Sequence, residues 1–452
     1  MRIRLGKPIA LRGIAFAMSG KFSYGHNPLI ENITTDSRTA IKGDLYIPIR
    51  GNRFNGEDFV KEIIKSGCYT ISSVHEEAHI QVKDTSRALL DFATYYNKNL
   101  PYILYRIGIT GSVGKTTTKE FAKILLSAKY KTHANEGNFN NGIGLPMSIL
   151  SAPRDSELLI MEMGMNHQGE ISQLSECLCP DLAVITNIGT SHIGNLGSRE
   201  NIARAKLEIE CGMADGKVYV PAEEQLLTNA KNKVTLSLTD KSADFYLESI
   251  GGRVAIYKQG EKYAEANFAF SEEHLKKCLL FACAIAIDSG IPPALLSDKI
   301  SIISTDNIRQ KMFSIGKYIF YADYYNASPE SILSSFDSVK SAKNLVGKSL
   351  LLGDVLELGD KSEEIHYGIG QSIPKGLFKS IFLFGNFAEH TARGAVNDGF
   401  PMERIHINTD LSRPEITALQ INEYCDAGEL ILMKASRGVK LERVLDFFKE
   451  RS

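Results

Sequence analysis

The chain has 452 residues, of which 43% are hydrophobic and 23% are charged, and its formal net charge at pH 7 is −1. This balance excludes a disordered chain. The length is well above the roughly 250–300 residues at which one hydrophobic core stops growing, so we expect three domains. A net charge near zero gives no general attraction to nucleic acid or to an anionic membrane, so an anionic ligand must be held by local groups.

The start of the chain and its cysteines bear on the cellular compartment. Arg2, Arg4 and Lys7 precede an apolar stretch, as in a signal peptide, but Arg12 interrupts that stretch and no small-residue cleavage site follows. We therefore expect residues 8–18 to form a helix of the folded protein. The seven cysteines are scattered without CxxC spacing, which favours a reducing cytosol, and no run of about 18 apolar residues predicts a membrane span. We expect a cytoplasmic monomer with no integral membrane association and no nucleic-acid partner.

Short β-branched runs alternate with longer helical patterns through most of the chain, which is typical of βαβ units around largely parallel sheets. The predicted fold class is therefore α/β. The beginning of the chain differs, because residues 34–59 are polar and contain glycine and residues 97–101 have the composition of a boundary turn. We expect an N-terminal domain over residues 1–100, a central domain over 101–314 and a third domain over 315–452.

The central domain is predicted to open with a strand over residues 102–109, a glycine turn and a helix. In that helix Phe121, Ile124, Leu125 and Ala128 recur at helical spacing. The third domain repeats strand-like and helical segments, a pattern typical of a Rossmann-like fold. Its strand-like segments are residues 318–322, 349–352, 380–384 and 429–433.

Residues 108–118 read GITGSVGKTTT and lie between the predicted strand and helix, as a phosphate-binding loop requires. Glycines let backbone N–H groups turn toward phosphate oxygens, the helix N-terminus adds positive potential, and Lys115 can reach the terminal phosphates. Ile109 occupies a position where the strict Walker pattern has glycine, so the match is to a variant of that pattern; a plain glycine turn before a helix is the alternative. The residues expected to bind the nucleotide are Thr110, Gly111, Ser112, Gly114, Lys115, Thr116 and Thr117.

Two later strands of the central domain are predicted to end in polar side chains. Residues 157–161 precede Glu162, and residues 182–186 precede Asn187 and His192. Ligands of open α/β sheets bind at such strand ends, and Mg²⁺ prefers carboxylate and phosphate oxygens, so Glu162 with Thr116 makes a candidate magnesium site. His192 would be a less usual ligand. Taken singly, a Glu after a strand is more often a loop carboxylate and a lone His more often structural, but the phosphate loop favours the functional interpretation.

Lys206 lies in a predicted helix over residues 199–211. Its residue type and position alone predict a solvated lysine on an exposed helix face, and nothing in the local chemistry overturns that interpretation.

Further motifs flank the phosphate loop in a characteristic order. Residues 35–38 read TDSR, residues 138–146 read NFNNGIGLP, residues 323–329 read DYYNASP, and residues 434–437 read KASR. With the loop and with Glu162 and His192, this order resembles the Mur ligase family over essentially the whole chain. The asparagine-rich element resembles that of the members that add D-alanyl-D-alanine to a UDP-muramoyl-tripeptide.

The resemblance implies a fold, a set of ligands and roles for particular residues. It implies a UDP-sugar-binding N-terminal domain, a central P-loop ATPase domain with a parallel sheet, and a Rossmann-like C-terminal ligase domain. It also implies ATP and Mg²⁺, with Lys206 carried as a carbamate that would ligate a second Mg²⁺. The implied catalytic residues are Lys115, Glu162, His192 and Lys206, and the implied metal ligands are Thr116, Glu162, His192 and Lys206. Arg309 and Asn326 would contact the nucleotide, and the implied substrate-binding residues are Thr35, Asp36, Ser37, Arg38, Asn138, Asn140, Asn141, Lys434, Ser436 and Arg437.

The chain departs from the family pattern at several points. Residues 55–57 read NGE where the family has Asp-Gly-His or similar, on the uridine side. Leu275 and Cys278 replace asparagines of a His-Asn-x-x-Asn pattern that approaches adenine, so we expect different adenine contacts. Ile308 and Ala435 replace glycines of the family motifs.

The expected reaction is ATP-dependent amide formation, because a carboxylate needs activation before an amine can displace its oxygen. The resemblance implies an acyl phosphate, with Mg²⁺ and Lys115 offsetting charge on the transferring phosphoryl group. Three alternatives stay open. They are a paralogous Mur-type ligase for another carboxylate and amine, a different phosphate-loop class, and a non-catalytic binding protein. A GTPase is disfavoured because the chain contains no Asn-Lys-x-Asp.

Overall fold

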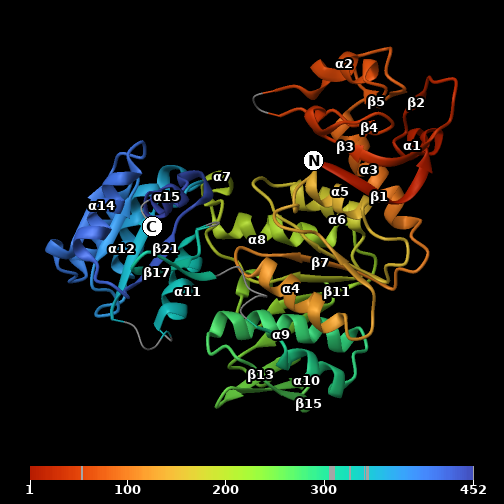
Figure 1. The fold of residues 1–452 in the computed structure, drawn as a ribbon. Helices are drawn as coiled ribbons and strands as arrows, with labels where there is room; N and C mark the ends of the chain where they lie inside the picture. The colour runs from red at the N-terminus through yellow and green to blue at the C-terminus, as the bar shows by residue number, and fades with distance from the viewer. Residues whose placement is uncertain (52–53, 305–310, 325–326, 341, 343–345, 451–452) are drawn as a thin grey trace.

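The computed structural model describes residues 1–51, 54–304, 311–324, 327–340, 342 and 346–450. Within these residues the strands form three sheets with helices packed on them, which confirms the predicted α/β class. We call the sheets and their helices the first body (β1 to β6), the central body (β7 to β15) and the third body (β16 to β21). Figure 1 shows the first and third bodies on different sides of the central one. The domain boundaries at residues 100 and 314 stay predictions.

The first body has a six-stranded sheet in the order β1-β3-β4-β5-β6-β2. The predicted helix over residues 8–18 is too long, because Ile9 and Ala10 continue the first strand and pair with β3, so that helix α1 begins at Leu11. The strands are β1 (Arg2–Ala10), β2 (Lys21–Phe22), β3 (Leu29–Thr34), β4 (Leu45–Tyr46), β5 (Tyr69–Ser72) and β6 (Ile80–Gln81), and the helices are α1 (Leu11–Ala17), α2 (Val60–Lys65) and α3 (Thr85–Lys98).

The central body has a nine-stranded sheet in the order β15-β14-β13-β12-β11-β10-β7-β9-β8. Strands β7 to β13 pair in parallel, as predicted. Strands β14 and β15 add an antiparallel edge that the sequence analysis missed. The strands are β7 (Tyr105–Thr110), β8 (Thr132–Ala134), β9 (Leu158–Glu162), β10 (Leu182–Ile185), β11 (Lys217–Pro221), β12 (Lys233–Ser237), β13 (Phe245–Ile250), β14 (Arg253–Lys258) and β15 (Glu261–Asn267).

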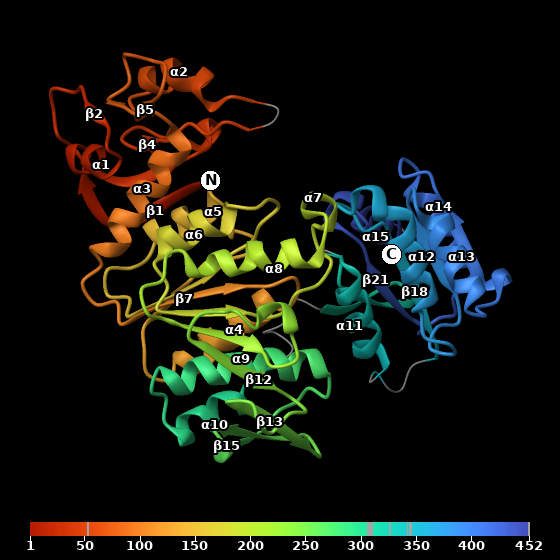
Figure 2. The ribbon, with the colours of Figure 1, turned by 180° about the vertical axis from the view of Figure 1, so that it is seen from behind.

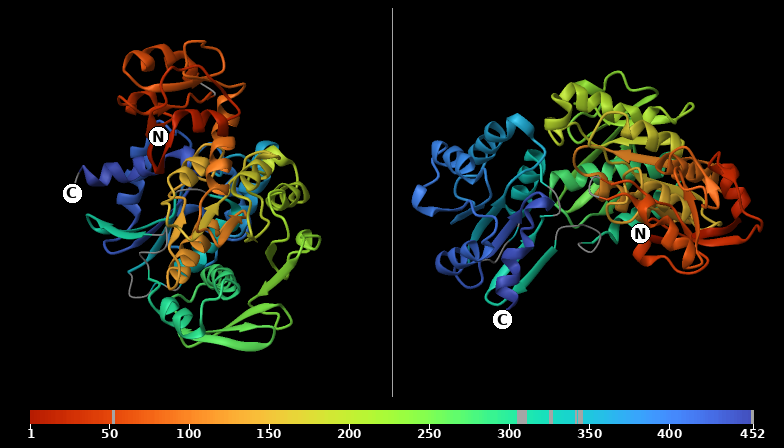
Figure 3. Two further views of the ribbon diagram at one scale, coloured as in Figure 1. Left: turned by 90° about the vertical axis from the view of Figure 1, so that its right-hand side faces the viewer. Right: turned by 90° about the horizontal axis from the view of Figure 1, so that it is seen from above.

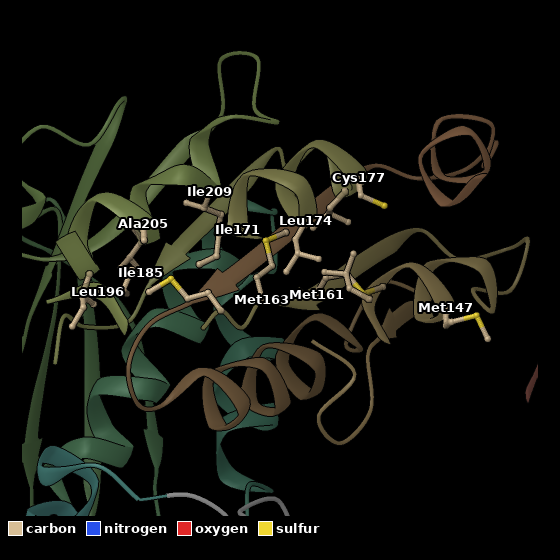
Figure 4. Packing of buried hydrophobic residues seen from close by; sticks show 14 of the residues in the cluster. Met147, Met161, Met163, Ile171, Leu174, Cys177, Ile185, Leu196, Ala205 and Ile209 are labelled. Carbon is tan, nitrogen blue, oxygen red and sulfur yellow. The ribbon is translucent and has the colours of Figure 1, made fainter. Parts of the chain in front are cut away.

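Helices cover both faces of the central sheet. In Figures 1 and 2, α6 and α8 lie on one side of β7, and α4 and α9 lie on the other. The apolar run of β9 is buried throughout, as expected for a strand covered on both faces. Figure 4 shows one of these interfaces, where Met161 and Ile185 from the sheet pack near Ile171 of α6 and Ala205 of α8. The helices are α4 (Lys115–Leu126), α5 (Gly144–Leu150), α6 (Glu170–Leu178), α7 (Ile193–Leu196), α8 (Arg199–Leu207), α9 (Glu273–Asp288) and α10 (Pro293–Ser301).

The third body has a six-stranded sheet in the order β16-β17-β21-β18-β19-β20, parallel except for β16. Alternate residues of β19 serve different cores, because Ile381 and Leu383 pack with α12 and α13 while Phe382 and Phe384 pack with α14 and α15. The strands are β16 (Lys311–Ile315), β17 (Tyr318–Ala322), β18 (Lys348–Gly353), β19 (Ile381–Phe384), β20 (Ile405–Asn408) and β21 (Leu430–Lys434), and the helices are α11 (Pro329–Lys340), α12 (Ser362–Gln371), α13 (Ala388–Asn397), α14 (Pro414–Tyr424) and α15 (Glu442–Lys449).

The junction between the central and third bodies lies at α7, which Figures 1 and 2 show beside the third body. Figure 3 shows the same division from above, with the third body on one side and the central body on the other. Strand β16 spans the predicted boundary at residue 314 and pairs with β17. No helix in the described part of the chain combines the length and apolar character needed to cross a membrane.

Asn97 joins the first body to the central one. The predicted boundary turn begins later than expected, because α3 continues through Asn97 and ends at Lys98. The fully buried Asn97 amide donates to the backbone oxygens of Cys177 (3.1 Å) and Leu178 (2.7 Å), and its oxygen accepts from Arg106 Nε (2.8 Å). This side chain therefore satisfies polar groups that would otherwise be buried without partners.

Asn97→Ala should lower the free energy of unfolding by about 1–3 kcal/mol, because it leaves two buried carbonyl groups and the Arg106 guanidinium short of a partner. Calorimetric melting of the full chain measures the effect. Asn99→Ala is the matched control, since the exposed Asn99 amide bonds only within its own helix, to Tyr95 O. Equal melting temperatures for the two variants would contradict this role of Asn97.

Candidate active site

A cleft of about 780 Å³ lies at the carboxyl ends of the central strands, where ligands of open α/β sheets bind. The phosphate loop forms its floor, and the loops after β9 and β10 form one wall. Helix α9 and residues of the third body form the other walls. Most of the predicted central-body residues meet in this cleft. Those that line it are Gly111, Ser112, Gly114, Lys115, Thr116, Thr117, Asn138, Asn140, Asn141, Glu162, His192 and Lys206.

The phosphate loop has the backbone geometry that its glycines predict. Gly111 and Gly114 have φ angles of +147° and +83°, a region that side-chain-bearing residues rarely adopt, and a Cβ on Gly111 would collide with the Thr186 hydroxyl. Lys115 begins α4 and its ammonium group folds over the loop, donating to the backbone oxygens of Gly111 (2.7 Å) and Ser112 (3.2 Å). The buried Thr110 hydroxyl instead donates to Met163 O (3.0 Å), so it supports the loop from below.

The segment after β10 holds the phosphate loop in shape. Asn187 Oδ1 accepts from the backbone N–H groups of Ser112 (3.0 Å) and Val113 (2.9 Å), and the Thr186 hydroxyl donates to Val113 O (2.5 Å). The Gly189 N–H in turn donates to Ser112 Oγ (2.9 Å). The sequence analysis placed Asn187 at this strand end without giving it a function; its function is to brace the loop.

Glu162 and Thr116 lie together, as the sequence predicts. The Thr116 hydroxyl donates to Glu162 Oε2 (2.6 Å), the Asn140 amide donates to Glu162 Oε1 (2.8 Å), and Glu162 is only 2% exposed. The described residues contain no cluster of three or more His, Cys, Asp or Glu side chains suited to a metal ion. Mg²⁺ needs few such ligands when phosphate oxygens and water supply the rest, so this hydroxyl and carboxylate fit it.

Asn135 and Lys119 support Glu162 and were missed by the sequence analysis. Asn135 Oδ1 accepts from the Glu162 N–H (2.9 Å), and its amide donates to Glu162 O (2.9 Å) and Phe139 O (2.8 Å). The buried Lys119 ammonium donates to Asn135 O. A lysine in the middle of an amphipathic helix pattern gives no sign of burial, so only the folded arrangement identifies this support.

His192 lines the cleft but also contacts the third body. Its Nδ1 lies 2.5 Å from Glu357 Oε2, and this close contact with His192, together with the charge of the ring, lowers the pKa of the Glu357 carboxyl group. His192 and Glu357 have φ angles of +64° and +66°. No local pattern in the sequence predicts the contact of Glu357 with His192.

Lys206 is buried, with only 2% of the residue exposed, so the interpretation of an exposed lysine was wrong. Burial, and secondly the positive charge of Lys115, hold the pKa of the Lys206 amine well below its usual value. No carboxylate among the described residues forms an ion pair with Lys206. A lowered pKa favours the neutral amine, which is the form that reacts with carbon dioxide, so the site fits a carbamate.

The described third-body candidates lie at the carboxyl end of β21. Lys434 is 2% exposed and donates to Asp323 Oδ2 (2.9 Å), and both residues line the large cleft. Ser436 and Arg437 line a separate cavity of about 110 Å³ that also touches His192. Ser436 Oγ accepts from the Leu356 N–H (2.9 Å). The two predicted nucleotide contacts Arg309 and Asn326 lie outside the described residues.

The predicted UDP-sugar segment lies in the first body and lines neither cavity. Asp36 caps the short helix η1 (Ser37–Thr39), accepting from the Arg38 N–H (3.1 Å) and from the Arg38 guanidinium (2.9 and 2.8 Å). The Arg38 hydrogen bond lowers the pKa of Asp36 to about 2. Thr35 lies beside the N-terminal amine (3.4 Å).

Two of the departures from the family pattern have structural explanations. Glu57 is buried and accepts from Ser72 Oγ (2.6 Å) and from the Ser73 N–H and Oγ (both 2.8 Å), so it braces β5. Leu275 and Cys278 are buried on the α9 wall of the cleft, and the Cys278 thiol lies against Gly114. The α9 wall therefore presents an apolar group and a thiol at the two positions where the family pattern has asparagine side chains.

Comparison with known proteins identifies the class of this site. Residues 109–285 match the model of the Mur ligase middle domain. The chain is 35% identical to the UDP-N-acetylmuramoyl-tripeptide–D-alanyl-D-alanine ligase of Bacillus subtilis, over 92% of this chain and 93% of that protein. It is 31% identical to the enzyme of the same name from Rickettsia prowazekii, over 92% of this chain and 94% of that protein. A crystal structure of MurF from Acinetobacter baumannii superposes with a TM-score of 0.87 at 26% identity, covering 99% of this chain and all of that one.

The phosphate loop, the cleft and these matches define an ATP-dependent Mur-type ligase. Within that class, the chain belongs to the family of UDP-N-acetylmuramoyl-tripeptide–D-alanyl-D-alanine ligases. The three-body architecture expected from the resemblance is the architecture of that family.

Asn135→Ala should weaken magnesium-dependent binding of an ATP analogue about tenfold, because the backbone of Glu162 loses its two bonds to the Asn135 side chain. Calorimetric titrations at several Mg²⁺ concentrations measure the effect. Asn397→Ala, on the exposed side of α13, is the control and should bind like the unmodified protein. An Asn135 variant with an unchanged magnesium requirement would disprove this supporting function.

Proposed function

We propose that the chain ligates D-alanyl-D-alanine to UDP-N-acetylmuramoyl-tripeptide with ATP, using the residues that line the large cleft. The observation that carries the proposal is that the phosphate loop, Glu162 and Lys206 meet in one cleft whose remaining wall comes from the third body. A site enclosed by two bodies suits an acyl phosphate, because excluding water protects that group from hydrolysis.

The proposed reaction has two steps. The terminal carboxylate of the tripeptide attacks the γ-phosphorus of ATP, which forms an acyl phosphate and releases ADP. The dipeptide amine then attacks the acyl carbon, and the tetrahedral intermediate expels inorganic phosphate and loses a proton from nitrogen. Lys115 and the loop N–H groups offset the negative charge that the transferring phosphoryl group carries.

The metal sites are proposed from the side chains that could hold them. Thr116 and Glu162 would hold one Mg²⁺ with the nucleotide phosphates, and His192 and the carbamate of Lys206 would complete the metal set. When bound, Mg²⁺ supplies positive charge next to the transferring phosphoryl group. The carbamate would place a negative charge near the Lys115 ammonium group, whose positive charge opposes protonation of the Lys206 amine and would attract an anion.

The remaining assignments follow the division of the chain into bodies. We assign residues 1–100 to UDP-sugar binding through Thr35, Asp36, Ser37 and Arg38, residues 101–314 to ATP binding, and residues 315–452 to ligation. Lys434, Ser436 and Arg437, with Asn138, Asn140 and Asn141 of the central body, would contact the peptide substrates. Arg309 and Asn326 would contact the nucleotide. We also propose that the enzyme acts in the cytoplasm, where ATP and UDP-activated substrates are available, and that it acts as a monomer.

The decisive measurement is ATP-dependent phosphate release with the tripeptide substrate, with and without D-alanyl-D-alanine, and identification of the product by mass. Release that requires both substrates and yields the pentapeptide is the expected result. Lys115→Ala should lose phosphate release and keep UDP-substrate binding, because its ammonium lies over the phosphate loop in a cleft that the proposed UDP-sugar segment does not line. Turnover by Lys115→Ala, or amide formation only with another carboxylate or amine, would refute the proposal.

Removal of carbon dioxide should lower the rate of the unmodified enzyme, and bicarbonate should restore it. The lowered pKa of Lys206 leaves its amine neutral at lower pH than an ordinary lysine, which favours carbamate formation. Lys206→Ala should be slower by about 100-fold or more and insensitive to bicarbonate. Labelled bicarbonate should give a carbamate signal by NMR in the unmodified protein alone; its absence together with a bicarbonate-independent rate would exclude the carbamate.

A further inference from the structure

His192 and Glu357 form an unusual contact across the junction of the central and third bodies. Their side chains approach to 2.5 Å between Nδ1 and Oε2, although the ring N–H does not point straight at the oxygen. Both residues have left-handed backbone conformations, with φ of +64° and +66°. Such conformations are costly for residues other than glycine and persist where the surrounding structure enforces them, typically at functional sites.

The third body also contacts the loop that carries His192 on either side of that residue, at Thr190 and at Gly194. Glu330, in the first turn of α11, accepts from the Thr190 N–H (2.7 Å) and hydroxyl (2.9 Å). The Glu357 backbone oxygen accepts from the Gly194 N–H (3.1 Å). Gly194 also packs against Gly359, so closely that a Cβ on Gly194 would meet the Glu357 oxygen and the Gly359 nitrogen. The position of His192 is therefore set by contacts with the third body as well as by the central fold.

An imidazole ring has two nitrogens, and the partner of one determines what the other can do. A histidine that binds a metal through one nitrogen usually donates its other N–H to a carboxylate or carbonyl group. That contact fixes the tautomer and orients the ring. Here the contact between Nδ1 and Glu357 leaves Nε2 as the remaining nitrogen of a ring that lines the cleft.

We propose that Glu357 is a positioning residue that orients His192 for metal binding, and that it does so only when the third body is docked on the loop after β10. The inference rests on the metal role proposed for His192. If Glu357 orients His192, the metal site depends on docking of the third body, because His192 belongs to the central body and Glu357 to the third. The enzyme would then complete its metal site only in the arrangement that also encloses the substrates.

Two properties of the contact make it testable. Glu357 is 49% exposed, so Glu357→Gln alters charge and hydrogen bonding without opening a cavity. The Glu357 backbone bond to Gly194 is unaffected by a side-chain substitution. Glu363→Gln, at the start of the neighbouring helix α12, removes the same charge from a side chain that is 70% exposed and serves as the matched control.

The experiment measures binding of Mn²⁺, as a paramagnetic substitute for Mg²⁺, to the full chain with a non-hydrolysable ATP analogue, by electron paramagnetic resonance. We expect Glu357→Gln to weaken Mn²⁺ binding about 10–100-fold and Glu363→Gln to leave it unchanged. In a His192→Ala background, Glu357→Gln should have no further effect, because Glu357 acts through that ring. Small-angle scattering of Glu357→Gln should match the unmodified chain, which separates loss of orientation from loss of docking.

Each result decides the question. Unchanged Mn²⁺ binding by Glu357→Gln would overturn the inference, because Glu357 would then have no effect on the metal site. Tighter binding would also overturn it, because the carboxylate would then compete with the metal for His192 Nδ1. An equal loss in the His192→Ala background would also overturn it, because Glu357 would then act elsewhere. If the unmodified chain bound no Mn²⁺ with the nucleotide, the proposed metal role of His192 would fail along with the inference. If it bound Mn²⁺ normally and Glu357→Gln did too, the inference alone would fail.

Discussion

The hydrogen bond from the Thr116 hydroxyl to the Glu162 carboxylate ties the first turn of α4 to the carboxyl end of β9. The bond adds a side-chain link to the backbone pairing of β7 with β9, and the geometry of the cleft depends on these two contacts together. Asn140 holds the other carboxylate oxygen, and Asn135 holds the backbone behind it. A loop fixed in this way needs little rearrangement when charge develops on a bound phosphoryl group, which is the electrostatic condition for efficient transfer.

Much of the fold could be predicted because its signals are local. Buried parallel strands read as continuous apolar runs, as in β9, and the glycines before Lys115 indicate a strand-to-helix turn. The antiparallel strands β14 and β15 escaped prediction because charged residues interrupt their sequences. Strand β16 was not predicted, because its pairing with β17 depends on position in space and not on composition.

The meeting of Lys115, Glu162 and His192 was predictable, because all three follow strands of one parallel sheet and the carboxyl ends of such strands lie at one edge. The supports were not, because Lys119, Asn135 and Asn187 have unremarkable side chains whose function arises from neighbours far along the chain. Lys206 shows the limit most clearly. Its sequence context predicts solvent exposure, and only the packing of α8 against the central sheet shows that the amine is buried.

The contacts of the loop after β10 with the third body also have a consequence for how such a chain can change over generations. Thr190, His192 and Gly194 meet Glu330 and Glu357 directly, so a substitution on one side is tolerated only with a compatible residue on the other. These two short segments, far apart in the sequence, should therefore vary together among relatives. A chimaera that joins the third body of one relative to the central body of another should lose activity unless both segments come from the same parent.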